Sequence, residues 1–148
     1  MEKSNVEHLF RTTKIVWVAF FVTQFSLLLA VFLAKREIFV FDFRQSLLGD
    51  KPIVPIIFGI MALLNLGLSF FLKSQAVARA IEEQNPKRVQ TAQILGLAFC
   101  ESISIMGIVL ALAFDYQYFF LWFALGILGM LLHFPSRDNF MAAAYRKP

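Results

Sequence analysis

The chain has 148 residues, of which 59% are hydrophobic and 16% are charged, with 18 phenylalanines and a formal net charge of +4. A soluble domain of this size cannot bury that much apolar material, so the composition excludes an ordinary soluble protein and indicates an integral membrane protein. The basic residues are dispersed, which argues against a nucleic-acid-binding surface, and the single cysteine excludes an internal disulfide and a CxxC metal site.

Four apolar segments are long enough to cross a membrane as helices, and we expect these helices at residues 15–34, 52–84, 88–114 and 116–135. The first segment is about 30 Å long as a helix, which matches the hydrocarbon core of a bilayer. It is too long for a signal peptide and lacks a small-residue cleavage pattern, so we expect it to be retained. Asn85 and Pro86 end the second helix, so the second and third helices are predicted to form a hairpin with a polar tip.

The distribution of basic residues predicts the orientation of these helices. Ten of the fourteen lysines and arginines lie in the N-terminal segment, the loop between the second and third helices, and the C-terminal tail. Because cytoplasmic loops collect lysine and arginine, both termini are predicted to be cytoplasmic. We therefore predict an all-α fold, with one membrane domain over residues 1–148 and four transmembrane helices.

One acidic residue, Glu101, lies inside the third apolar segment. A carboxylate at mid-bilayer depth costs roughly 3 kcal/mol on insertion scales, so such residues commonly have a function. In a hairpin that turns near residue 84, Glu101 lies level with Asn65 and Ser69, which share one face of the second helix. Oxygen ligands at one depth suit a proton or a small hard cation. We therefore predict an ion-binding site formed by Glu101, Ser102, Asn65 and Ser69, while a purely structural, interhelical hydrogen bond from Glu101 stays open as the alternative.

Other polar and small residues in the membrane have simpler interpretations. Thr23 and Gln24 lie at the middle of the first helix, where they can also face inward. His133 is expected at the membrane interface rather than as a ligand. A stripe of small residues on the third helix predicts close packing against another helix, and its members are Gly96, Cys100, Ser104 and Gly107. We find no nucleophile–base pair, phosphate loop or metal motif, so we expect neither an enzyme nor a metal site.

The sequence AVARAIEEQNPKRVQTAQILGLAFCESISIMGIVLALAF, residues 76–114, resembles the membrane-ring subunit c of rotary ATP synthases. The matching pieces are Gln84 and Pro86 in the loop, residues 94–99, Glu101, and residues 105–111. The resemblance implies a homo-oligomeric ring in a bacterial-type inner membrane, with Glu101 as the ion-binding carboxylate and Ser102 as the hydroxyl beside it in sodium-type rings. Here the second helix has only Gly59 and Gly67 where the family has a run of glycines, so a ring of this chain is expected to be wider.

Two functions from different classes follow as expectations. The first is a ring-forming ion carrier that moves protons or sodium ions through Glu101 and works against stator-like or stalk-like partner proteins. The second is a ring-forming scaffold without transport, with lipid in the ring interior and Glu101 as an interhelical hydrogen-bonding group. Both imply copies of the chain itself and membrane lipids as partners, no nucleic acid, and no cofactor beyond a proton, a sodium ion or structural lipids.

Overall fold

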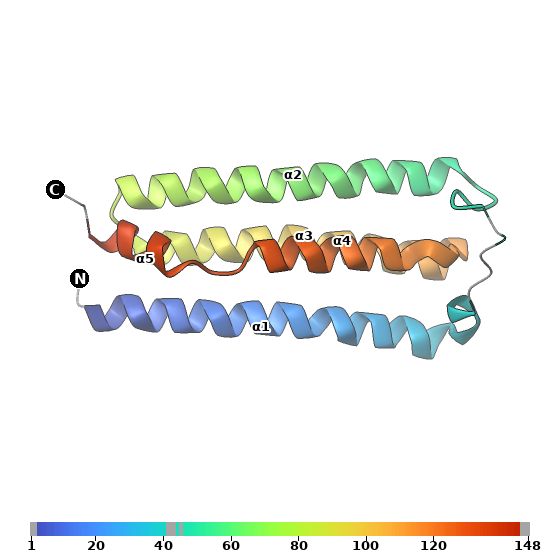
Figure 1. Cartoon of the computed structure of the whole chain (residues 1–148), viewed down its shortest axis with the longest axis horizontal. Coiled ribbons are helices and arrows are strands. Elements are labelled where there is room, and N and C mark those ends of the chain that lie inside the picture. The colour runs from blue at the N-terminus through green and yellow to red at the C-terminus, as the bar shows by residue number, and fades with distance from the viewer. Residues whose placement is uncertain (1–2, 41–43, 45, 146–148) are drawn as a thin grey trace.

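The computed structural model describes residues 3–40, 44 and 46–145, and within these ranges the chain is helical without strands. Its elements in order are α1 (Lys3–Ala34), the 3-10 turn η1 (Arg36–Phe39), α2 (Ile53–Glu82), α3 (Pro86–Phe114), the 3-10 turn η2 (Gln117–Phe119), α4 (Phe120–Leu132) and α5 (Arg137–Ala144). They form an elongated bundle with α1 and α2 on opposite sides and α3 and α4 between them (Figure 1). The predicted all-α fold is confirmed.

Helix α3 is the centre of the bundle, because α1, α2 and α4 all pack against it. It buries twelve residues, whereas α2, which is one residue longer, buries only four. The outward face of α2 consists of large apolar side chains such as Leu63 and Leu64, which are 63% and 62% exposed. Helices α1, α2 and α3 are each long and apolar enough to cross a membrane. These features indicate a membrane-embedded, multi-pass protein, in which lipid covers the exposed apolar faces.

The turn between α2 and α3 follows the local chemistry of Asn85 and Pro86. Helix α2 ends at Glu82, and Gln84 adopts the left-handed conformation with φ of 51°. The Asn85 side chain then caps α3 by accepting a hydrogen bond of 3.2 Å from the Lys87 backbone N–H, and Pro86 takes the first helical position. The predicted hairpin turn is confirmed.

The fourth segment differs from the single helix expected over residues 116–135. It begins with η2, continues as α4 for 13 residues, and breaks before α5, which is bent by 46° relative to the preceding helix. Helix α4 is only about 20 Å long, which is shorter than the hydrocarbon core. Pro135 explains the break, because a proline disfavours helical geometry in the residue before it.

Helix α5 returns the chain to the end of the bundle where α1 begins (Figure 1). Phe140 and Ala143 of α5 pack in one buried cluster with Val6 of α1 and with Val89 of α3. The helix α1 begins at Lys3 rather than at residue 15, because apolar residues of its first turns, such as Val6, pack against α5. Two basic residues used to predict the orientation, Arg146 and Lys147, lie outside the described residues.

Candidate functional site

The stripe of small residues on α3 is the contact surface for α4. A Cβ atom added to Gly107 would lie 3.0 Å from the Phe119 carbonyl oxygen, and one added to Gly126 of α4 would lie 2.9 Å from the Cys100 carbonyl oxygen. Gly129 is similarly close, because its Cβ would lie 2.8 Å from the Cys100 sulfur. The close approach predicted from the stripe therefore occurs inside one chain, and all four of its members are buried: Gly96, Cys100, Ser104 and Gly107.

Glu101 lies near the middle of α3, fifteen residues after Pro86 and thirteen before Phe114. It is half-buried and contacts α1, where the Thr23 hydroxyl oxygen is 3.0 Å from a Glu101 carboxylate oxygen. The same Thr23 oxygen is 2.7 Å from the backbone carbonyl oxygen of Phe20. The carboxyl group thus has a hydrogen-bonding partner on another of the three long apolar helices.

The Thr23 hydroxyl can serve both protonation states of Glu101. A hydroxyl has one proton to donate and two lone pairs that accept, whereas a carbonyl oxygen only accepts. When Glu101 is ionised, the hydroxyl donates to the carboxylate. When Glu101 is protonated, its carboxyl donates to the Thr23 oxygen and the hydroxyl donates to the Phe20 carbonyl. Rotation of one hydroxyl group therefore keeps the carboxyl hydrogen-bonded whether or not it carries a proton.

The other residues of the predicted site do not gather around Glu101. The Ser102 hydroxyl donates to the Phe99 carbonyl of its own helix at 2.7 Å, and the buried Ser69 hydroxyl donates to the Leu66 carbonyl at 2.6 Å. Asn65 is half-buried and has no hydrogen bond to a described residue. None of the three is hydrogen-bonded to Glu101 within the described residues, whereas Thr23 on the first helix is.

Two further polar side chains are buried close to this depth. Gln24 is 1% exposed and Ser104 is 0% exposed, and their side-chain polar atoms have no hydrogen-bond partner among the described residues. Because α1 and α3 run in the same direction and Thr23 contacts Glu101, Gln24 and Ser104 lie within about one helical turn of each other in depth. An unsatisfied buried polar group costs about 1–3 kcal/mol, so this layer of the bundle is polar at the expense of stability.

A second polar cluster centres on His133, at the C-terminal end of α4. Its Nδ1 atom is 2.8 Å from the Gly129 carbonyl oxygen, which can only accept, so Nδ1 carries the proton in the neutral ring. The ring lies against Phe70 of α2, with ring centroids 4.3 Å apart, and the Cys100 sulfur is 3.9 Å from Nδ1. The Gln93 amide donates to the His133 backbone carbonyl. This cluster connects α2, α3 and α4.

The His133 side chain is fully buried between the helices, and its expected depth at the membrane interface stays a prediction. Gly96 makes room for the ring, since a Cβ atom at this position would lie 2.9 Å from His133 Nε2. The spacing of Gln93, Gly96 and Cys100 along one face of α3 was the available signal, because it places an amide, a gap and a thiol side by side. Within the described part of the chain, no group of three or more His, Cys, Asp or Glu side chains could hold a metal ion.

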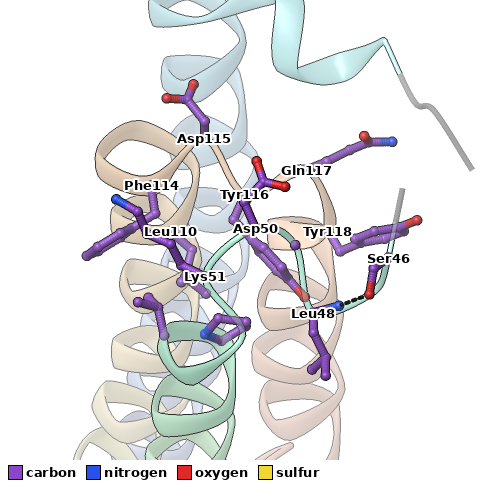
Figure 2. Close-up of a pocket in the computed structure, with 13 residues that line it drawn as sticks. Ser46, Leu48, Asp50, Lys51, Leu110, Phe114, Asp115, Tyr116, Gln117 and Tyr118 are labelled. Carbon is purple, nitrogen blue, oxygen red and sulfur yellow. Dashed lines mark hydrogen bonds between the residues drawn. The ribbon is translucent and has the colours of Figure 1, made fainter. Parts of the chain in front are cut away.

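The opposite end of the bundle contains a pocket of about 370 Å³. Ser46, Leu48, Asp50 and Lys51 approach Tyr116 there, beside the end of α3 (Figure 2). Tyr116 lies between α3 and η2, and burial raises the pKa of its phenol above the usual value. The phenol therefore stays protonated at neutral pH, and it donates a hydrogen bond of 2.6 Å to the Leu47 carbonyl. This contact fixes the loop before α2 onto the α3–α4 connection.

The fold and these polar layers define a multi-pass helical membrane protein with a carboxyl group in the middle of its central helix. Comparison with protein-family models, with curated proteins and with solved structures finds no match. The similarity of residues 76–114 to subunit c of rotary ATP synthases therefore stays a prediction from the sequence.

Proposed function

We propose that this protein is a membrane-embedded, proton-binding subunit in which Glu101 takes up and releases a proton near the middle of the bilayer. The observation that carries the proposal is the 3.0 Å contact between the Thr23 hydroxyl and the Glu101 carboxyl, on a stretch of α3 that has no other charge from Val89 to Phe114. Thr23 provides hydrogen bonding for both the charged and the neutral carboxyl. Intramembrane acids with such a partner are typical of proton-transfer sites.

A proton is favoured over a sodium ion as the bound species. A hard cation requires several oxygen ligands converging on one point. The contact between Glu101 and Thr23 joins one carboxylate oxygen and one hydroxyl oxygen, and the hydroxyls of Ser102 and Ser69 donate to carbonyls of their own helices. Two oxygens that share a hydrogen bond are sufficient for a proton.

The second part of the proposal is assembly into a ring of copies in an inner membrane, with cytoplasmic termini and stator-like or stalk-like partners. The support is the resemblance of residues 76–114 to subunit c. Since α4 covers the small-residue stripe of α3, copies would meet through the exposed apolar faces of α1 and α2. Those faces carry bulky side chains such as Val22 and Leu64, which favours a wide ring with lipid in its interior.

A scaffold without transport is the second candidate function, and the same hydrogen bond favours it in a different way. Thr23 and Glu101 connect α1 to α3, and an interhelical hydrogen bond in a membrane stabilises a bundle by about 0.6 kcal/mol on average. In this case Glu101 is a structural group, and its proton does not exchange during function.

The test is carbodiimide labelling of the full-length protein in vesicles over a range of pH. Dicyclohexylcarbodiimide reacts with a protonated carboxyl group in an apolar environment, so a proton-exchanging Glu101 should label strongly at low pH and weakly at high pH. Glu101→Gln should abolish labelling, and the matched control Glu83→Gln, at the exposed tip of the hairpin, should leave it unchanged. Absence of labelling at every pH, with labelling of a known reactive carboxyl in parallel, would exclude the carrier.

Two further variants separate the carrier from the scaffold. Thr23→Val keeps the shape of the side chain but removes its hydroxyl, so a carrier should lose proton uptake into vesicles. A scaffold takes up no protons in either form and would only lose about 0.6 kcal/mol of stability. Native gels of Glu101→Gln test the assembly, since a glutamine still forms hydrogen bonds and should keep the oligomer intact. A monomeric wild-type particle would contradict the ring in either function.

A further inference from the structure

A groove of about 450 Å³ runs along the outside of the α2–α3 hairpin, near its turn. Each helix contributes one stripe of four residues at helical spacing, and the stripes oppose one another in register across the hairpin. In order from the turn inward, α2 contributes Arg79, Ala76, Gln75 and Leu72, and α3 contributes Arg88, Thr91, Ala92 and Leu95. The groove is therefore basic at one end and apolar at the other, with two alanines along its length.

The charged side chains of the groove are two arginines, and no acidic residue lines it. Arg79 has no carboxylate partner among the residues that the structure describes. Arg88 forms one ion pair, with a guanidinium nitrogen 2.6 Å from a Glu83 carboxylate oxygen. A guanidinium group has five N–H donors, so Arg88 keeps donors free for a second anion. Two arginines at one end of the groove favour a phosphate headgroup with a net negative charge over a headgroup with no net charge.

The groove lies at the depth of lipid headgroups. Helix α2 is about 45 Å long, which exceeds a hydrocarbon core of about 30 Å, so its last turns extend beyond that core. The uncharged part of α2 ends at Leu72, where the groove begins, and Lys73 follows. The seven residue steps from Leu72 to Arg79 rise about 10 Å, which is enough to cross the headgroup layer of about 5–8 Å on one side of the bilayer.

We propose that this groove binds an anionic phospholipid. Its phosphate lies between Arg79 and Arg88, and its glycerol and upper acyl carbons follow the Ala76 and Ala92 notch to the leucines. Basic pockets between helices at this depth are a general means of recognising acidic headgroups. The apolar end opens directly to the acyl-chain region at Leu72 and Leu95, which an isolated soluble anion would leave unused.

The test is native mass spectrometry of the full-length protein in detergent, titrated with phosphatidylglycerol or phosphatidylcholine of identical chains. The wild-type protein should retain one phosphatidylglycerol at a concentration about 30-fold lower than for phosphatidylcholine, about fivefold for each arginine. The double variant Arg79→Gln/Arg88→Gln should lose this preference. The control Arg11→Gln/Lys14→Gln removes the same charge from α1 and should keep it.

A variant of opposite sign tests the same proposal without removing an arginine. Glu83→Gln releases Arg88 from its ion pair, so retention of phosphatidylglycerol should increase several-fold even if the double variant fails to fold. Unchanged or weaker retention in Glu83→Gln would overturn the proposal. Equal retention of the two lipids by the wild type, or equal loss in the control, would also overturn it, as would displacement of the lipid by an equimolar amount of inorganic phosphate.

Discussion

The two faces of α3 that contact α4 and α1 are built in different ways. Toward α4, Gly107 packs against Phe119, and Gly126 and Gly129 pack against Cys100, so closely that added Cβ atoms would lie 2.8–3.0 Å from backbone or sulfur atoms. Toward α1, the contact contains the Thr23–Glu101 hydrogen bond and a buried Gln24 without a partner among the described residues. The α3–α4 interface brings the two helix backbones close together, whereas the α1–α3 interface contains polar side chains among large apolar side chains.

This difference follows from what drives helix association in lipid. Since apolar side chains gain nothing by leaving lipid for protein, stability comes from close packing and interhelical hydrogen bonds. The glycine interface supplies close packing between α3 and α4. Helix α1 contains no glycine, so its interface with α3 has room for ionisable and amide groups whose hydrogen bonds change with protonation. Proton binding at Glu101 is thus expected to be separable from folding.

The largest expected effect comes from filling the glycine interface. In Gly126→Ala, the new methyl group would lie 2.9 Å from the Cys100 carbonyl oxygen, which is backbone and cannot rotate away. Overpacking of this kind costs about 2–3 kcal/mol, so the midpoint of thermal unfolding in detergent should fall clearly. The matched control is Gly67→Ala on α2, where the added atom has no neighbour within 4 Å.

Gly67→Ala should be neutral or slightly stabilising, because alanine is the better helix former by about 0.5–1 kcal/mol. Equal destabilisation by the two alanine substitutions would show that the α3–α4 interface is not specially close, and the contrast between the two faces of α3 would fail.

The second prediction addresses the α1 interface and has the opposite sign. Gln24→Leu replaces a buried, unsatisfied amide with an apolar side chain of similar volume, so the free energy of unfolding should rise by about 1–2 kcal/mol. Carbodiimide labelling of Glu101 in the same variant reports whether the amide also supports proton exchange. A destabilised Gln24→Leu would mean that the amide is satisfied in the membrane, and it would contradict the view of this layer as polar at a cost.

The contrast also separates what the sequence predicts from what it does not. The three long helices, the turn at Asn85–Pro86 and the small-residue stripe follow from composition, proline chemistry and helical spacing. Counting residues from the hairpin turn predicts the depth of Glu101 but not the direction of its side chain. Successive side chains on a helix point about 100° apart, so neighbouring residues face different helices. Cys100 consequently faces the His133 cluster while Glu101 faces Thr23, away from the predicted partners Asn65 and Ser69.

The fourth segment shows a second limit of the sequence. Hydropathy predicted one helix over residues 116–135, but Pro135 ends α4 early and folds α5 across the end of the bundle. His133 follows Gly129 by four residues, on the same face of α4, and its ring fills the gap that Gly96 leaves on α3. Pro135 is a local signal for the break, whereas the gap depends on a contact between helices that are distant in sequence.

The smallest expected effect concerns the polar attachment of α1 to α5. An Arg137 guanidinium nitrogen lies 3.0 Å from a Glu7 carboxylate oxygen, and the two side chains are 56% and 39% exposed. Exposed ion pairs contribute less than about 1 kcal/mol and are screened by salt, so Arg137→Gln should lower the free energy of unfolding by no more than about 0.5 kcal/mol at low ionic strength. Glu7→Gln should cost the same, and the double variant should cost no more than either single one. A larger loss that persists in 1 M salt would mean that this ion pair attaches α1 at this end, rather than the packing of Phe140 and Ala143 against Val6. Helix α1 would then be attached by charge, whereas α4 is attached by close packing.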